Sequence, residues 1–251
     1  MLLPLVVEGL ANVRDLGGLE RKDGSVTPPG VFIRAEALDR LSASGWEALR
    51  AHGVRTVIDL RRPSEYTGRV PNDIQLVRVD LDGDERDFWD PIELDGRWGT
   101  PLYYLAHLRE LPYRLAEVLR AIAAADDGAV LFHCRAGWDR TGLVSAVLLR
   151  ALDVTDDAAT SDYLASFANA ETMAELHGRS FDVDERHEVL ARFGHTAESA
   201  FRSMYGALDL DEWFRISGIE DETRIAVVTW RGSVPGEAAF GVDLLPAALP
   251  S

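Results

Sequence analysis

Residues 129–142 read AVLFHCRAGWDRTG, and the order of residue types in this stretch decides the fold. Residues 129–132 form a short apolar run that ends at His133, which is typical of a buried strand. Cys134, the only cysteine of the chain, follows at once, and five residues separate it from Arg140, where a helical pattern begins. The stretch therefore predicts a strand, a short loop and a helix in direct succession.

Three apolar runs upstream have the same character as residues 129–132. They are short, rich in β-branched side chains and bounded by Gly, Pro or Asp, so we expect strands at residues 31–33, 54–60 and 74–79. Helical periods lie between them: one starts after Ser42, a predicted N-cap, and stops at Gly53, and another covers residues 101–125 with a break at Pro112. This alternation predicts an α/β fold with a mostly parallel central sheet flanked by helices.

The second half of the chain is predicted to be mainly helical. Residues 141–152 and 156–168 have helical periods, the latter with Thr155 as N-cap, and weaker periods follow. Residues 224–230 instead resemble a strand, and we expect poor order in the Pro-, Gly- and Ala-rich end that comes after it. The predicted organisation is a single domain over residues 1–218 and a C-terminal extension over residues 219–251.

The composition of the 251 residues excludes several classes of protein. With 47% hydrophobic and 27% charged residues the chain can bury a substantial core, and one cysteine cannot build a disulfide scaffold. No stretch approaches the roughly 20 consecutive apolar residues of a membrane span. A net charge of −16 repels nucleic-acid phosphates and anionic membrane surfaces, so we expect neither as a partner. The first residues lack the features of a secretory signal, so we expect a cytoplasmic protein with a reduced thiol.

The loop after Cys134 has the chemistry of an anion site. The same positive field that binds an oxyanion at a helix N-terminus favours the Cys134 thiolate, which is a competent nucleophile. Gly137 permits tight curvature, and the Arg140 guanidinium offers two parallel donors to phosphate oxygens. Of the 26 basic residues only Lys22 is a lysine, so an anion site here depends on arginine. Six successive backbone N–H groups complete the predicted phosphate-binding set: Arg135, Ala136, Gly137, Trp138, Asp139 and Arg140.

Two neighbours of the loop have predicted supporting roles. The His133 ring either hydrogen-bonds the loop backbone and fixes Cys134, or simply packs at the end of the strand. We expect the Thr141 hydroxyl to donate a hydrogen bond to the cysteine sulfur, which eases the later departure of sulfur as a thiolate.

Three carboxylates are candidates for the general acid that protonates a leaving oxygen. Asp139 lies beside Arg140, where a bound phosphate dianion would raise the carboxyl pKa and keep the proton on; its alternative role is that of a helix N-cap. Asp82 and Asp84 lie in the acidic stretch after the predicted strand at residues 74–79, and we expect most of this stretch to be a solvated face.

The sequence predicts no metal site and no cofactor. Asp80, Asp82 and Asp84 have the first spacings of a calcium loop, but Glu85 and Pro91 stand where glycine and glutamate are needed. The histidines other than His133 form no HExxH motif and no cluster with the cysteine. The loop dipoles and the arginine can supply the charge stabilisation without a metal.

The stretch HCRAGWDRTG resembles the signature loop of the cysteine-dependent phosphatases, and more narrowly that of a bacterial tyrosine-phosphatase family whose loop reads HCxAGKDRTG. Residues 12–18, NVRDLGG, are similar to the NFRDLGG of that family. One departure is Trp138, which replaces the lysine of the family pattern; GWDRT is similar to the loop of the myotubularin lipid phosphatases. Weaker similarities are FIRAEAL at 32–38, VIDLR at 57–61 with Glu65, DYL at 162–164, and Tyr205 with Gly206.

The resemblance implies the fold of these phosphatases and a catalytic set of Cys134, Arg140 and Asp139. Because the lysine is missing, the resemblance gives less support to multiply phosphorylated lipid substrates. Trp138 is then either core packing or a wall for a phenyl or inositol ring. Arg14 and Asp15 of NVRDLGG, and Arg61 of VIDLR, are expected to form structural ion pairs that hold the first segment against the sheet.

These observations predict a phosphomonoester hydrolase, a protein-tyrosine phosphatase that acts through a phosphocysteine on a phosphotyrosine protein or another small aryl phosphomonoester. A phosphoinositide phosphatase of similar loop chemistry and a non-catalytic phosphopeptide-binding module are the alternatives. A rhodanese-type sulfurtransferase also uses a strand, a cysteine loop and a helix, but it needs neither Arg140 nor a proton donor at Asp139.

Overall fold

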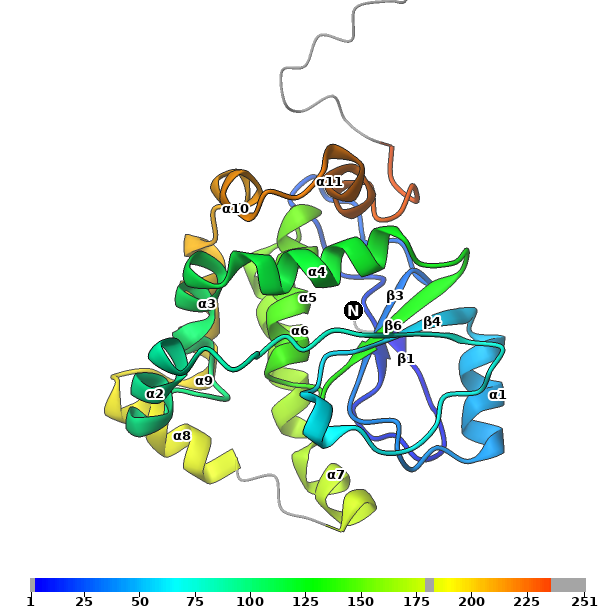
Figure 1. The fold of residues 1–251 in the computed structure, drawn as a ribbon, viewed down its shortest axis with the longest axis horizontal. Helices are drawn as coiled ribbons and strands as arrows, with labels where there is room; N and C mark the ends of the chain where they lie inside the picture. Colours follow the sequence, from blue (N-terminus) through cyan, green and yellow to red (C-terminus); the bar gives the residue numbers. More distant parts are fainter. Residues whose placement is uncertain (1–2, 179–182, 236–251) are drawn as a thin grey trace, which may run out of the picture.

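The computed structural model describes residues 3–178 and 183–235, and its centre is a six-stranded sheet in the order β1-β2-β3-β6-β4-β5 (Figure 1). The strands β3, β6, β4 and β5 are parallel, whereas β1 and β2 join the edge beside β3 in antiparallel pairing. The mostly parallel sheet of an α/β fold is confirmed. The strand bounds are β1 Leu3–Pro4, β2 Arg14–Asp15, β3 Phe32–Ala35, β4 Val54–Asp59, β5 Gln75–Arg78 and β6 Ala129–His133.

The parallel register brings the loops after three strands to one edge of the sheet. Ala35 of β3 and Asp59 of β4 both lie opposite His133 of the central strand β6. The chain therefore leaves these strands at the same level, and ligand sites of parallel sheets form outside the carboxyl ends of the strands. Cys134 is the first residue past β6.

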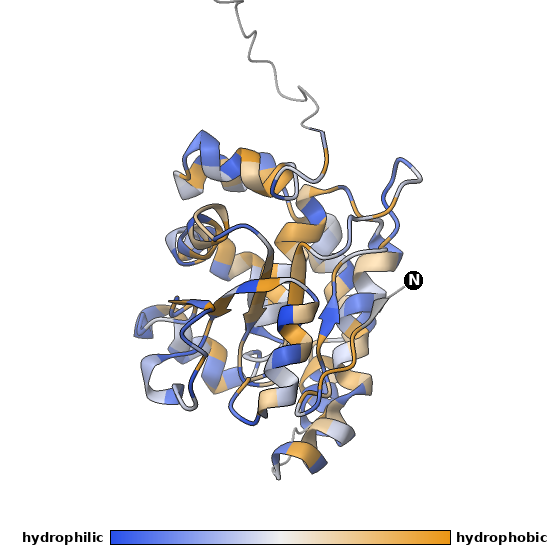
Figure 2. Cartoon of the chain, turned by 90° about the vertical axis from the view of Figure 1, so that its right-hand side faces the viewer, coloured by the Kyte–Doolittle hydropathy of each residue, from blue (hydrophilic) through white to orange (hydrophobic). Residues whose placement is uncertain are grey.

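Helices bury both faces of the sheet. Alternate residues of a strand point to opposite faces. In β6, Phe132 packs in the cluster that contains α4 (Pro112–Ala123) and α5 (Arg140–Ala151), and Leu131 packs with Trp46 of α1 (Ala43–Ala51). Figure 1 shows α1 on one side of the sheet and α4 and α5 on the other. Two-sided burial explains the nearly continuous apolar sequence of β6, AVLFH, which is buried along its whole length. In Figure 2, hydrophobic colours are present within the sheet and on the helices beside it.

Capping residues set several of the predicted helix bounds. Ser42 accepts a hydrogen bond from Gly45 N at the start of α1, and Thr155 accepts one from Ala158 N at the start of α6 (Asp156–Ala168), both at 3.3 Å. The helical region at residues 101–125 divides at Pro112, as predicted. The other helices are η1 Pro63–Glu65, α2 Arg86–Asp95, η2 Pro101–Tyr103, α3 Tyr104–Glu110, α7 Ala170–His177, α8 Val183–Arg192, α9 Ala197–Ala207 and α10 Leu210–Ser217. No helix in the described ranges is long and apolar enough to cross a membrane.

The predicted strand at residues 224–230 is wrong, because this segment contributes to α11 (Asp221–Val228). The helix packs against α4 and α5. Just beyond it, the Trp230 ring is fully buried with its centroid 4.5 Å from that of Phe32, and its Nε1 donates to Pro28 O at 3.1 Å. Tertiary packing therefore overrides the β propensity of the segment. We predicted poor order for the C-terminal end. From residue 236 onward, this end lies outside the described residues.

Candidate active site

The sulfur of Cys134 lies at the base of a loop that leads from β6 into α5. The side chain is buried, and Gly137 N donates a hydrogen bond to Sγ at 3.3 Å. The N-terminus of α5, which starts at Arg140, adds the positive end of its dipole. An amide donor and a helix N-terminus together stabilise negative charge on the sulfur.

Gly137 is the one loop position that only glycine fits. Its φ is +71°, and an added Cβ would lie 2.6 Å from Ala35 O and 2.7 Å from Glu36 N, both backbone atoms that cannot move aside. The loop therefore packs directly on the end of β3. The tight curvature predicted for Gly137 is confirmed.

Two side chains from the first part of the chain hold the loop carbonyls. Asn12 Nδ2 donates to Ala136 O at 2.9 Å, and Arg34 Nη2 donates to Gly137 O at 2.7 Å. In a trans peptide the C=O and the following N–H point in opposite directions. These bonds therefore turn the N–H groups of Gly137 and Trp138 toward the inside of the loop, as the contact between Gly137 N and the sulfur shows.

Arg34 itself belongs to a buried ion-pair network. Asp162 of α6 accepts hydrogen bonds from Arg34 Nη1 and, at 2.6 Å, from Arg14 Nε. Burial alone would raise the pKa of Asp162, but the two guanidinium groups outweigh it and lower the pKa. Burial, followed by the positive charge of Arg34, lowers the pKa of Arg14 to about 10. Arg14 is thus a structural ion-pair residue, as predicted, although its partner lies on α6 rather than on the sheet.

Asp15 and Arg61 also make structural contacts. Asp15 accepts hydrogen bonds from Gly17 N and Gly30 N at 2.7 Å and lies 2.9 Å from His52 Nε2, so it ties the first segment to α1. Arg61 pairs with Asp59 at 2.8 Å and with Asp39 at 2.9 Å, which fixes the loop after β4.

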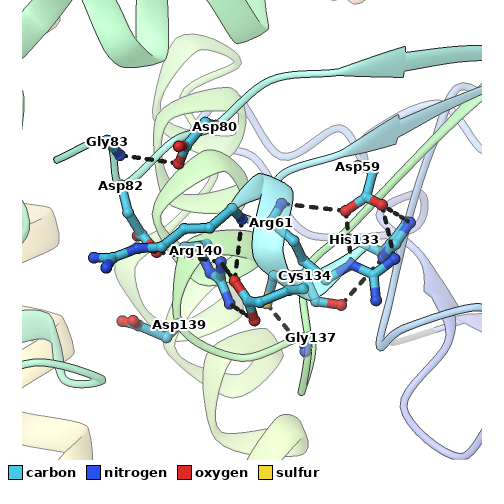
Figure 3. Close-up of polar contacts among 12 residues, drawn as sticks. Asp59, Arg61, Asp80, Asp82, Gly83, His133, Cys134, Gly137, Asp139 and Arg140 are labelled. Atoms are coloured by element: carbon cyan, nitrogen blue, oxygen red, sulfur yellow. Dashed lines mark hydrogen bonds and ion pairs between the residues drawn. The ribbon is translucent and has the colours of Figure 1, made fainter. Parts of the chain in front are cut away.

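Arg140 is held beside the loop by two carboxylates. Glu65 accepts from Nη1 at 2.6 Å and from Nη2 at 3.0 Å, and Asp82 Oδ2 lies 3.2 Å from Nη1. Burial would lower the pKa of Arg140, but these carboxylates raise it well above the ordinary value. Figure 3 shows Arg140 among Cys134, Asp82 and Asp139. Glu65 takes the end-on fork of the guanidinium, and the side-on fork of Nε and Nη2 makes no hydrogen bond to Glu65 or Asp82 through Nε.

Asp139 occupies the N-cap position of α5, but its side chain makes no capping hydrogen bond. Its alternative role as a capping side chain is therefore wrong. Oδ2 accepts a hydrogen bond from the Tyr103 hydroxyl at 2.9 Å, and Oδ1 is buried without a hydrogen-bond partner among the described residues. Burial, followed by the negative charge of Asp82, raises the pKa of Asp139 to about 7. Such a carboxyl exchanges its proton near neutral pH.

The other two candidate acids are placed differently. Asp82 pairs with Arg62 Nε at 3.1 Å and with Arg140, and its backbone O accepts from Trp89 Nε1 at 2.7 Å. The loop that carries Asp82 is thus fixed at both its side chain and its backbone. Asp84 is exposed and makes no hydrogen bond or ion pair with the loop among residues 3–178 and 183–235, so the structure does not bring it into the site.

Of the supporting residues, His133 contacts the loop backbone and Thr141 does not contact the sulfur. His133 Nδ1 lies 3.1 Å from Cys134 O, and burial lowers the pKa of the ring, so the neutral ring donates this bond. The Thr141 hydroxyl is buried and has no hydrogen-bond partner in the described part of the chain, so its predicted bond to Sγ is absent. Thr141 is the second residue of α5 and is fully buried, so the helix backbone sets the position of its side chain.

The Trp138 ring is packed in the core rather than exposed as a wall of the site. It stacks on Phe167 of α6 with ring centroids 5.0 Å apart and an interplanar angle of 9°, and it is clustered with Ala170 and Met173. Arg135, the first residue after the cysteine, is exposed. Among the described residues, no group of three or more His, Cys, Asp or Glu side chains is placed to hold a metal ion.

The structure adds three groups of functional residues that the sequence did not assign to the site. Asn12 and the Arg34–Asp162 pair hold the loop, Glu65 holds Arg140, and Tyr103 holds Asp139. Asn12, Arg34, Glu65 and Asp162 lie in the stretches that are similar to the family, and this similarity was the sequence signal that could have identified them. Tyr103 lies in none of these stretches, so no signal in the sequence indicated its role.

A parallel sheet whose central strand ends in a cysteine, a loop with inward amides and an arginine at the start of a helix defines the class of cysteine-dependent phosphatases. Residues 5–226 match the model of the tyrosine phosphatase family, and the chain belongs to that family.

Named relatives agree with this family. The chain is 32% identical over 164 residues to a tyrosine-protein phosphatase of Nostoc commune, which covers 63% of this chain and 54% of that protein. It is 27% identical to a putative tyrosine-protein phosphatase of Cupriavidus necator, over 64% of this chain and 62% of the relative. It is 31% identical to the triple specificity protein phosphatase PtpB of Mycobacterium tuberculosis, over 64% of this chain and 71% of that relative. The chain thus spans only about half to two thirds of the first two relatives.

Proposed function

We propose that the protein hydrolyses phosphomonoesters, phosphotyrosine proteins or other aryl phosphates above all, through a phosphocysteine intermediate. The observation that carries the proposal is the Cys134 sulfur, which accepts a hydrogen bond from Gly137 N inside a loop whose neighbouring carbonyls are held outward. Nucleophile and oxyanion donors are thereby fixed before substrate arrives, so little reorganisation is needed at the moment of reaction.

In the first step the Cys134 thiolate attacks phosphorus, and a sulfur–phosphorus bond forms while the bond from phosphorus to the ester oxygen breaks. The loop amides and the side-on fork of Arg140 hold the three equatorial oxygens. Asp139 gives its proton to the departing ester oxygen. The alcohol or phenol leaves, and the phosphoryl group remains on sulfur.

In the second step water attacks the phosphocysteine. Asp139, now ionised, takes a proton from the water as the new oxygen–phosphorus bond forms and the sulfur–phosphorus bond breaks. The electron pair returns to sulfur as a thiolate, and inorganic phosphate is released. Asp139 is thereby reprotonated for the next turnover.

The geometry favours Asp139 over Asp82 as the acid. Asp82 lies in ion pairs with Arg62 and Arg140; burial raises its pKa, but both guanidinium groups favour its ionised form. Its backbone is tied to Trp89, so this loop is not arranged to swing over a substrate. Asp139 has one oxygen without a partner among the described residues and is fixed to the start of α5.

The chain has a single cysteine, which makes the test of the nucleophile unambiguous. Cys134→Ser should abolish turnover of an aryl phosphate while it preserves competitive binding of inorganic phosphate, because the loop remains but an alkoxide is not accessible at neutral pH. Iodoacetamide should inactivate the wild-type protein at a stoichiometry of one label, and inorganic phosphate should protect it.

Residual activity of Cys134→Ser within about tenfold of wild type would remove the thiol from the mechanism, since loss of a covalent nucleophile costs far more than this. A phosphopeptide-binding module would release no inorganic phosphate from any substrate. A sulfurtransferase would instead transfer sulfur from thiosulfate, which is measured in the same preparation.

A further inference from the structure

We propose that Tyr103 is a positioning residue that selects which oxygen of Asp139 delivers the proton to the leaving group. The inference rests on the proposed function, since it assigns Asp139 the role of acid. Tyr103 is the last residue of η2, and its hydroxyl donates a hydrogen bond to the Asp139 carboxyl.

Contacts around Tyr103 fix the phenol ring. The residue is 1% exposed, and its ring lies edge-on against Trp89 at 5.3 Å and against Tyr104 at 5.1 Å between centroids. Its hydroxyl donates to Asp139 Oδ2 at 2.9 Å. The neighbouring Tyr104 hydroxyl donates to the backbone O of Asp139 at 2.8 Å, so adjacent tyrosines hold the side chain and the main chain of the same residue.

This geometry determines which oxygen of the protonated Asp139 carboxyl carries the hydrogen. A protonated carboxyl carries one hydrogen, and a hydrogen on Oδ2 would face the hydrogen that Tyr103 already donates to that atom. The Tyr103 hydrogen bond to Oδ2 therefore favours the form whose proton is on Oδ1, the buried oxygen that has no hydrogen-bond partner among the described residues. From Oδ1 the proton passes to the ester oxygen as the phosphorus–oxygen bond breaks, and in the second step Oδ1 takes a proton back from water.

The groups that face Asp139 set the sign of the expected pH effect. They are Tyr103 from η2, Tyr104 from α3, Asp82 from the loop after β5, Arg140 from α5 and Tyr163 from α6. Burial and then Asp82 raise the pKa of Asp139, while the hydrogen bond from Tyr103, the charge of Arg140 and, less strongly, the Tyr104 hydroxyl lower it. Burial, and next to it Asp139, raises the pKa of Tyr103 well above its ordinary value, so Tyr103 remains a donor throughout the working pH range.

Tyr103→Phe tests the inference with a single lost hydroxyl. Without this donor the ionised Asp139 is less stable, so the basic limb of the kcat/KM profile should move to higher pH. The acid also loses its fixed orientation. We therefore expect kcat/KM to fall about tenfold for phenyl phosphate, which needs the proton, and less than about twofold for nitrophenyl phosphate, which departs with little help.

Tyr163→Phe is the matched control. Its hydroxyl is also buried close to Asp139 but makes no hydrogen bond within the described residues. This variant should keep the wild-type basic limb and the wild-type ratio of phenyl to nitrophenyl phosphate turnover. The inhibition constant of inorganic phosphate, measured for both variants, reports whether the loop is intact.

Equal losses on both substrates with an unmoved basic limb would overturn the inference and leave Tyr103 a packing residue. If Tyr103→Phe does not fold, 3-fluorotyrosine at position 103 serves instead: its more acidic phenol is a stronger donor, so the limb should move to lower pH, and no movement overturns the inference. Failure of the proposed function has a different signature, namely turnover by Cys134→Ser or an unchanged limb in Asp139→Asn.

Discussion

Replacing Asp162 by asparagine measures how much the buried network behind the loop contributes to stability. The carboxylate lies between Arg14 and Arg34, and all three side chains are at most 5% exposed. Asp162→Asn preserves the volume but leaves two buried cations without their counter-charge. Breaking a buried ion pair in this way costs about 3–5 kcal/mol of unfolding free energy. For a domain of this size the Tm should fall by roughly 6–20 °C.

The same helix supplies the control for this measurement. Asp157 of α6 pairs with Arg202 at 2.6 Å, but the two side chains are 86% and 40% exposed. Asp157→Asn should therefore lower the unfolding free energy by less than about 1 kcal/mol. Urea denaturation at neutral pH, with the midpoint and slope fitted for each protein, gives the comparison. Equal losses for the two variants would refute the argument from burial.

The pH dependence of the Asp162→Asn effect identifies its origin. The folded-state pKa of Asp162 is lowered, so the ionised carboxylate stabilises the folded protein above the unfolded pKa of about 3.9. The difference in unfolding free energy between wild type and variant should be complete above roughly pH 4–5 and should shrink as the pH falls toward the folded pKa. A difference that stays constant down to acid pH would show that charge is not its cause.

Three other predictions concern the reaction itself. Arg140→Lys should lower kcat/KM for an aryl phosphate about a hundredfold, because an ammonium group has no planar forks and cannot make paired hydrogen bonds to Glu65 and to phosphate together; a loss below about threefold would contradict this. The wild-type kcat/KM should fall as the pH rises through about 7, where Asp139 loses its proton, and Asp139→Asn should remove this limb and reduce turnover most for poor leaving groups; an unaltered limb would assign the acid to another group, Asp82 first. Phosphotyrosine peptides should have higher specificity constants than multiply phosphorylated phosphoinositides because the loop carries Trp138, packed in the core, where the family pattern has a lysine; the opposite order of wild-type constants would reverse our substrate assignment.

Local signals in the sequence were sufficient for the loop and for the helices around it. The N-caps Ser42 and Thr155 and the break at Pro112 act on residues within one helical turn, and their helices have the predicted bounds. The strand-loop-helix order of residues 129–142 likewise depends only on near neighbours.

Contacts between distant segments could not be predicted. Arg14 and Asp162 are separated by 148 positions, and each alone resembles an ordinary polar residue. The two-residue strands β1 and β2 are too short to show a period, and α11 is helical because of the surface on which it packs. The role of Tyr103 also depends on such a contact, because 36 positions separate it from Asp139.

The position of β6 has a consequence for how the protein is made. β6 is the last strand of the sheet along the chain, yet it lies between β3 and β4. At about 5–20 residues per second, a ribosome needs roughly 4–15 s to pass from the end of β4 to the end of β6. During that interval the facing edges of β3 and β4 have no partner, and such edges invite pairing with other chains. These edges stay open until β6 has been synthesised, just before Cys134 is added. Trp230 can reach Phe32 only when nearly the whole described chain has been made.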